Sequence, residues 1–176
     1  ASFAGLFAFV TASPFLYLDY FGLSPGTYPL VFGVNVVVIA LSNRVNIHLL
    51  RKRTPQQNLR LGLLIQLVAA LGLVAVTALD IASLVIVVPL IMLFTGMIGL
   101  ITPNAISSLL DHFGHISATA TALLGGIQFT CGALAGVMVG LFEVEHLWPM
   151  VLTMLGAALL GNIGVRKLTK APAADG

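Results

Sequence analysis

The residue types best suited to chemistry gather in the segment Asp111-His112-Phe113-Gly114-His115. Two imidazoles three residues apart, beside a carboxylate, can bind a metal ion on one face of a helix. Gly114 interrupts that face, however, and the nearby Ser107 and Ser108 are not set in the Gly-x-Ser-x-Gly elbow of a serine hydrolase. We therefore expect no catalytic residue, no metal site and no cofactor in this chain.

Other polar side chains lie within long apolar runs, where each costs free energy unless it is paired or faces a cavity. Asn35 and Gln128 are in the middle of two such runs. Both amides are interpreted either as hydrogen bonds between helices or as contacts to a bound substrate. Asp19 has Tyr17 and Tyr20 as neighbours, so it is a candidate proton or cation site, or else an interfacial residue in an aromatic belt.

The composition places these side chains in a membrane. The 176 residues include only 8 Lys and Arg and 6 Asp and Glu, and 59% of them are hydrophobic; the mean hydropathy is +1.06. A soluble domain carries about 25% charged residues, three times the 8% found here. This composition excludes soluble enzymes, nucleic-acid-binding proteins and disordered segments.

The spacing of the charges predicts six transmembrane helices. Each of six stretches without formal charge has at least 18 residues, about the length that crosses ~30 Å of hydrocarbon. We expect an all-α membrane protein in which residues 1–170 form one bundle and residues 171–176 form a disordered tail. The expected spans are 1–18, 29–43, 61–79, 82–102, 118–141 and 147–165.

The basic residues predict the orientation of this bundle. All eight lie in the 44–60 loop or the C-terminal tail, which the six spans place on one side together with the 103–117 loop. The opposite side carries only acidic residues: Asp19, Asp80, Glu143 and Glu145. By the positive-inside rule both termini face the cytoplasm. Because Ala1 is not an initiator methionine, we also expect the chain to be part of a longer protein.

Local signals add detail to the spans. Pro14 predicts a kink in the first span, and Thr54-Pro55 predicts a helix start. The short turn at 79–83 predicts that the third and fourth spans are antiparallel neighbours. Small residues every four positions predict close helix packing along the fifth span; they are Ala118, Ala122, Gly126, Gly132, Gly136 and Gly140.

Several segments resemble the second half of a major facilitator superfamily transporter, specifically the Bcr/CflA group of drug:proton antiporters. The most specific are Pro103-Asn104-Ala105 and the run from Ala118 to Phe129 that ends in Gly-Gly-Ile-Gln-Phe. The others are 12–17, 21–25, 30–35, 43–46, 49–51 and 99–102. The resemblance covers nearly the whole chain.

The resemblance implies that the six spans are helices seven to twelve of a twelve-helix fold, and that the first, second, fourth and fifth spans line a cavity. It implies a substrate site on these helices, formed by Tyr17, Phe32, Asn35, Gln128 and Phe129. Asp19 would then couple protons. Asn43, Arg44 and Arg51 would form a conformational latch, in which Asn43 stands for the family's Asp and Asn46 for its second Gly. The Arg51-Lys52-Arg53 cluster is otherwise a topology signal that contacts lipid headgroups.

The implied function is proton-coupled export of an amphipathic drug across a bacterial cytoplasmic membrane. The implied partners are the lipid bilayer, the substrate, protons and an N-terminal six-helix half. Two alternatives stay open: a permease for a sugar or other metabolite, and a non-transporting six-helix membrane subunit. A charged cavity would favour the metabolite, whereas an apolar, aromatic cavity favours a drug, and Phe32, Phe94 and Phe129 are available for it.

Overall fold

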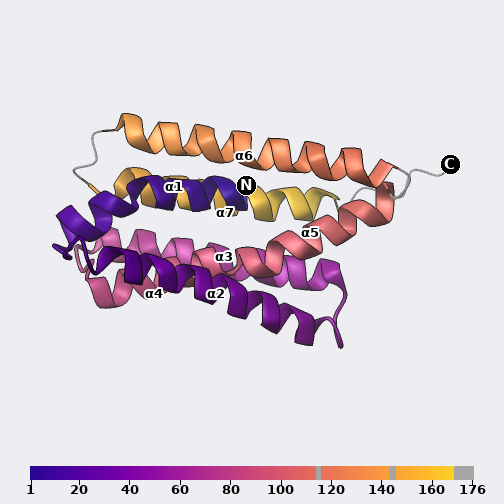
Figure 1. Cartoon of the computed structure of the whole chain (residues 1–176), viewed down its shortest axis with the longest axis horizontal. Coiled ribbons are helices and arrows are strands. Elements are labelled where there is room, and N and C mark those ends of the chain that lie inside the picture. The colour runs from indigo at the N-terminus through magenta and orange to yellow at the C-terminus, as the bar shows by residue number, and fades with distance from the viewer. Residues whose placement is uncertain (114–115, 143–145, 169–176) are drawn as a thin grey trace.

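A computed structural model describes residues 1–113, 116–142 and 146–168 as a bundle of long helices (Figure 1). Six helical segments of this described part are long and apolar enough to cross a membrane, which confirms the predicted fold class. The helices are α1 (Ser2–Pro14) with the π-helix η1 (Phe15–Tyr20), α2 (Tyr28–Leu49), α3 (Pro55–Ala78), α4 (Leu84–Gly96), α5 (Ile98–Phe113), α6 (Ser117–Leu141) and α7 (Trp148–Leu168). The predicted disordered tail, His115, Glu143 and Glu145 lie outside the described residues.

Two of the spans are interrupted. The kink predicted at Pro14 is a change from α-helix to π-helix, because η1 begins directly after that proline. The fourth span is not one helix ending at residue 102, as predicted. It breaks after Gly96, and α5 then continues through Pro103 to Phe113. The prediction placed the end too early because a proline in a helix removes only one backbone donor, and packing of the following turns holds α5 together.

The packing of the helices gives two layers. In one layer α6 lies against α1, and α2 lies against α4 and α5; in the other, α7 and α3 pack on each other and against the first layer (Figure 1). The predicted neighbours α3 and α4 do pack together. The core between the layers includes Phe9, Leu73, Ile91 and Met154, all of which are fully buried.

The small-residue stripe of α6 packs on α1 over only part of its length. A Cβ atom added at Gly132 would lie 2.7 Å from the Phe7 ring, and one at Gly136 would lie 2.8 Å from the Thr11 hydroxyl oxygen. Gly126, in contrast, has nothing within 4 Å of such an atom. The predicted close packing is therefore confirmed for the second half of the stripe and is wrong for Gly126.

The chain reverses direction at two ends of the bundle. We call the end where α2 ends, α3 begins and α7 ends the basic end, since the exposed Arg51 and Lys167 lie there (Figure 1). The helix start predicted there is confirmed by a capping box, in which the Thr54 hydroxyl accepts from the Gln57 amide and the Gln57 side chain accepts from the Thr54 amide. Asp19 and Asp80 lie toward the opposite end.

Candidate functional site

Two of the predicted substrate residues, Tyr17 and Phe32, belong to one aromatic group. Phe9 stacks on Phe32 with ring centres 6.0 Å apart and meets Tyr17 edge-on at 6.2 Å. Tyr28 completes the group, 5.8 Å from Tyr17 and 5.9 Å from Phe32. We call these residues of α1, η1 and α2 the four-ring cluster. Tyr17 is fully buried.

Asn35 follows Phe32 by one turn of α2, and its side chain is 4% exposed. The Thr95 hydroxyl of α4 lies 3.1 Å from the Asn35 Oδ1 atom and can donate to it, while the Asn35 amide group donates weakly to the Val31 carbonyl oxygen at 3.4 Å. Thr95 also lies 2.9 Å from the Ile91 carbonyl oxygen, so the two acceptors share its single proton. The interpretation of Asn35 as a link between helices is thus confirmed, and its second role stays a prediction.

The Tyr17 hydroxyl is buried and makes no hydrogen bond of ordinary length among the described residues, although the Asn35 side chain lies close enough to interact with it weakly. The neighbouring hydroxyls are already paired: Ser13 and Tyr28 lie 2.9 Å apart, and Ser13 also donates to the Val10 carbonyl oxygen at 2.8 Å. Buried polar groups in native structures almost always have a partner, so an orphan hydroxyl requires an explanation. Here the hydroxyl lies at the edge of the four-ring cluster, with the Asn35 side chain as a weak polar neighbour among the described residues.

The other two predicted substrate residues lie apart from the four-ring cluster, on α6. Phe129 is 61% exposed and meets Phe3 and Phe7 edge-on, with ring centres 6.0 and 6.1 Å away. Gln128 beside it is half-buried. The structure therefore divides the five predicted substrate residues into two groups, with α1 between them.

Three other predicted features are a cavity-lining Phe94, a proton site at Asp19 and a pair of histidines. Phe94, offered as a cavity-lining ring, is fully buried, and its ring packs so close to Gly5 that a Cβ there would lie 2.5 Å away. Its expected place in a cavity is therefore wrong. Asp19 is exposed at the end of η1, and its role in proton coupling stays a prediction. His112 and His115 have side chains outside the described residues, so their arrangement is not part of the site.

Among the predicted latch residues in the sequence lies Asn46, the centre of a buried polar group that sequence reasoning missed. Asn43, Arg44 and Arg51 are all exposed toward the basic end. Asn46, one turn beyond Asn43, is buried, and its Oδ1 atom accepts two hydrogen bonds. They come from Asn58 of α3 at 3.0 Å and Asn104 of α5 at 2.7 Å.

We call Asn46, Asn58 and Asn104 the asparagine triad. It joins α2, α3 and α5, and Asn104 also donates to the carbonyl oxygen of Leu100. The Oδ1 atom of Asn58 is buried without a partner among the described residues. The available signal was the segment Pro103-Asn104-Ala105, which carries the family resemblance, together with the substitution of the motif's second Gly by Asn46.

Over the residues that the structure describes, the fold and site define a class: a six-span membrane bundle whose buried polar side chains are uncharged amides and hydroxyls. No family model and no solved structure matches the chain. Two curated proteins do. It is 28% identical over 168 residues to the "Bicyclomycin resistance protein homolog" of Haemophilus influenzae, covering 96% of this chain and 42% of that protein.

The second relative is the "Uncharacterized MFS-type transporter YdgK" of Bacillus subtilis, 27% identical over 168 residues and 94% of this chain. The chain spans about two fifths of the length of these relatives, 42% and 41%. Both relatives are transport or resistance proteins by name, and the resemblance to the major facilitator superfamily is confirmed.

Proposed function

We propose that this chain is the second six-helix half of a major facilitator transporter that exports an amphipathic drug in exchange for protons. The observation that carries the proposal is the similarity, over 96% of the chain, to a protein named for bicyclomycin resistance. Two six-helix halves would rock about a site at the middle of the membrane. The partners are then the first half, the bilayer, the drug and protons, in a bacterial cytoplasmic membrane with both termini inside.

The chemistry of the four-ring cluster supports a drug over a sugar or charged metabolite. Its four side chains, Phe9, Tyr17, Tyr28 and Phe32, are aromatic and uncharged, and the polar groups beside it are the Asn35 amide and hydroxyls. Binding sites for drug-sized molecules are mostly apolar with a few polar groups that fix orientation. The unpaired Tyr17 hydroxyl is a group that a ligand could use once the cluster opens.

The exposure of α2 and α6 supports a missing half. These two spans are the least buried of the six, and both expose aliphatic side chains along the helix. Examples are Val36, Val37 and Leu41 on α2 and Leu134, Val137 and Met138 on α6. These two helices lie at opposite edges of one layer, α6 beside α1 and α2 beside α4 and α5, and each would contact a helix of the second half.

Drug uptake into inverted membrane vesicles tests the proposal, with the full-length protein and a small panel of amphipathic antibiotics. We expect uptake when the vesicles are energised, and its loss when an uncoupler dissipates the proton gradient. If no antibiotic moves although the protein is inserted and folded, the drug assignment is wrong.

Variants of the two aromatic groups test the site. We expect Asn35→Ala and Phe32→Ala to change the relative uptake of different drugs, because each alters the four-ring cluster or its polar neighbour. Gln128→Ala and Phe129→Ala test separately whether α6 contributes. Gln56→Ala, an exposed amide in the first turn of α3, is the control and should leave the drug profile unchanged.

A further inference from the structure

A buried glutamine in the middle of α3 links α1 to the end of α4. Gln66 is fully buried, and both ends of its amide group are paired. Its Oε1 atom accepts from the Ser2 hydroxyl of α1 at 2.8 Å, and its Nε2 atom donates to the Phe94 carbonyl oxygen of α4 at 3.2 Å. The second bond is informative because Phe94 lies in the last turn of α4.

The Phe94 carbonyl group lies where the regular backbone bonds of the fourth span stop. In a continuous α-helix its oxygen would accept from the Ile98 amide, but Ile98 is the first residue of α5. The last carbonyl groups of a helix lack donors from their own helix and need a partner from elsewhere. Gln66 supplies such a donor beside the break. We call the segment 96–98, between the two helices, the joint.

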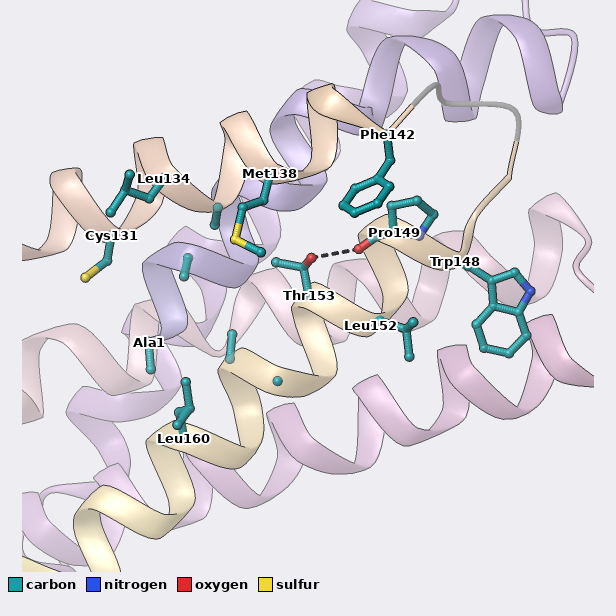
Figure 2. A pocket seen from close by; sticks show the side chains of 14 residues that line it. Ala1, Cys131, Leu134, Met138, Phe142, Trp148, Pro149, Leu152, Thr153 and Leu160 are labelled. Atoms are coloured by element: carbon teal, nitrogen blue, oxygen red, sulfur yellow. Dashed lines mark hydrogen bonds between the residues drawn. The ribbon is translucent and has the colours of Figure 1, made fainter.

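Thr95, the residue after Phe94, carries the bond from α4 to α2. Its hydroxyl lies 3.1 Å from the Asn35 Oδ1 atom and 2.9 Å from the Ile91 carbonyl oxygen of its own helix. Thr153 of α7 shows the simpler arrangement, in which the hydroxyl donates to the carbonyl oxygen four residues earlier, at 2.7 Å (Figure 2). A small shift in the last turn of α4 would therefore leave Thr95 bonded to Ile91 alone and remove the donor to Asn35.

Three helices hold this last turn of α4 in place. Gln66 of α3 binds its backbone, and Asn35 of α2 binds the Thr95 hydroxyl. From α1, Gly5 lies so near the Phe94 ring that a Cβ atom on this glycine would be 2.5 Å from the ring. Contacts from α1, α2 and α3 thus meet at the turn that ends at the joint.

We propose that Gln66 is a positioning residue of the drug site: it fixes the last turn of α4 and thereby holds the Thr95 hydroxyl against Asn35. Gln66 acts through the Phe94 backbone and does not itself contact the drug. The Asn35 Oδ1 atom is then occupied, so the Asn35 side chain offers a ligand its amide hydrogens rather than its oxygen. This inference rests on the proposed function, in which Asn35 is a polar group of the drug site.

A double-mutant cycle of melting temperatures tests the link between Gln66 and Thr95 without any drug. In the purified full-length protein, Gln66→Met keeps an unbranched side chain of similar length but removes both hydrogen bonds, and Thr95→Val removes the hydroxyl. We expect each variant to lower the melting temperature. The double variant should fall by less than the sum, because the bond between Thr95 and Asn35 is already lost without Gln66. Thr153→Val is the matched control, and its shift should add to that of Gln66→Met.

Binding of ethidium, a fluorescent amphipathic cation, tests the consequence for Asn35. The aromatic amines of ethidium donate hydrogen bonds, and in Gln66→Met the Asn35 Oδ1 atom becomes free to accept one. We therefore expect ethidium to bind about three- to tenfold more tightly to this variant than to the wild type, the value of one hydrogen bond. Thr95→Val should give the same gain, and the double variant no further gain. Loss of packing alone would weaken binding instead.

Asn162→Leu is the matched control for a general loss of stability. Asn162 of α7 is also a buried amide, and its Nδ2 atom donates to the Leu63 carbonyl oxygen of α3 at 2.9 Å. Removing this bond should lower the melting temperature but leave the affinity for ethidium unchanged. If Gln66→Met fails to fold, Ser2→Ala takes its place, since it removes one of the two bonds of Gln66 and should give smaller shifts of the same sign.

Each part of the proposal has its own contradicting result. Additive melting shifts for Gln66→Met and Thr95→Val would show that Gln66 does not hold Thr95, whatever the protein binds. A coupled cycle without a gain in ethidium affinity would refute the role in the drug site. Absence of ethidium binding to the wild type would contradict the proposed function as well, and the melting cycle would then still decide the link between Gln66 and Thr95.

Discussion

The Asn46 side chain connects three helices, because its Oδ1 atom accepts hydrogen bonds from two other helices. A latch of charged residues would depend on ion pairs, but the buried side chains of the asparagine triad are neutral amides. Neutral hydrogen bonds need no counterion and lose less on leaving water than charges do. We interpret the triad as the part that holds α2, α3 and α5 together at the basic end.

Removing the shared acceptor tests this interpretation. Asn46→Ala leaves the amide group of Asn58 without its bond to α2 and removes one of the two bonds of Asn104. An unsatisfied buried donor costs about 1–3 kcal/mol, so the free energy of unfolding in detergent should fall by about that much. Asn43→Ala, at an exposed asparagine three residues earlier, should change it by less than ~0.5 kcal/mol. Equal effects of the two variants would contradict the role of the triad.

Removing the Tyr17 hydroxyl should not lower the free energy of unfolding, in contrast to removing the Asn46 side chain. Because the hydroxyl is buried and makes no hydrogen bond of ordinary length among the described residues, removing it in Tyr17→Phe should leave the free energy of unfolding unchanged or raise it, by up to ~3 kcal/mol. If the hydroxyl serves a ligand, the same variant should lower the uptake of some drugs in vesicles. A clear loss of stability would instead show that the hydroxyl has a structural partner in the membrane.

The sequence predicted individual site residues unevenly. Tyr17 and Phe32 were singled out by the family resemblance, and Asn35 is in addition an amide in the middle of an apolar run. The structure brings the three close together. Asn58 and Tyr28 were missed because they lie at helix starts, where polar and aromatic residues are expected anyway. Which of them turn inward depends on the rotation of each helix, and helices that are apolar on all sides carry no periodic signal of that rotation.

Among the elements, the contact of α5 with α2 depends on one glycine. A Cβ atom at Gly99 would overlap the Ile39 carbonyl oxygen and lie 3.0 Å from the Asn43 backbone nitrogen. These backbone atoms cannot move without displacing α2. The close approach of the two helices thus places the latch segment of α2 directly beside the first turn of α5.

We therefore expect Gly99→Ala to separate α2 from α5. Overpacking of this kind costs about 1–3 kcal/mol, measurable as a lower melting temperature, and the displaced helix should weaken the bond between Asn46 and Asn104. Gly33→Ala on α2 is the matched control, since a Cβ atom there has nothing within 4 Å and alanine favours a helix over glycine. If Gly99→Ala were as stable as the control, the helices would not be in direct backbone contact.

The sequence predicts the elements better than their breaks. Charges mark the ends of the spans because a charge inside the bilayer is costly, so each of the six expected spans has a helical counterpart, although the second, third and fourth extend beyond their predicted bounds. Pro14 marks the change from α1 to the π-helix η1, whereas no charge or other predicted signal marks the break after Gly96.

For the whole molecule, the arrangement of the ends predicts which side of the membrane each loop faces. Lys52→Cys lies at the basic end and Ser24→Cys in the turn between η1 and α2 at the other. In an otherwise cysteine-free full-length protein in intact cells, we expect a membrane-impermeant maleimide to label residue 24 and not residue 52. Labelling of residue 52 alone would reverse the orientation that the basic residues predict.

The central claim is that drug and protons move in opposite directions through one protein, and the movement of protons tests it most directly. Inverted vesicles containing the full-length protein are energised, and the pH gradient is followed with a fluorescent amine that is quenched inside acidic vesicles. Addition of a transported drug should restore part of the fluorescence, with a smaller response for Asn35→Ala and none in vesicles that lack the protein. Drug uptake without any change in the proton gradient would contradict the claim.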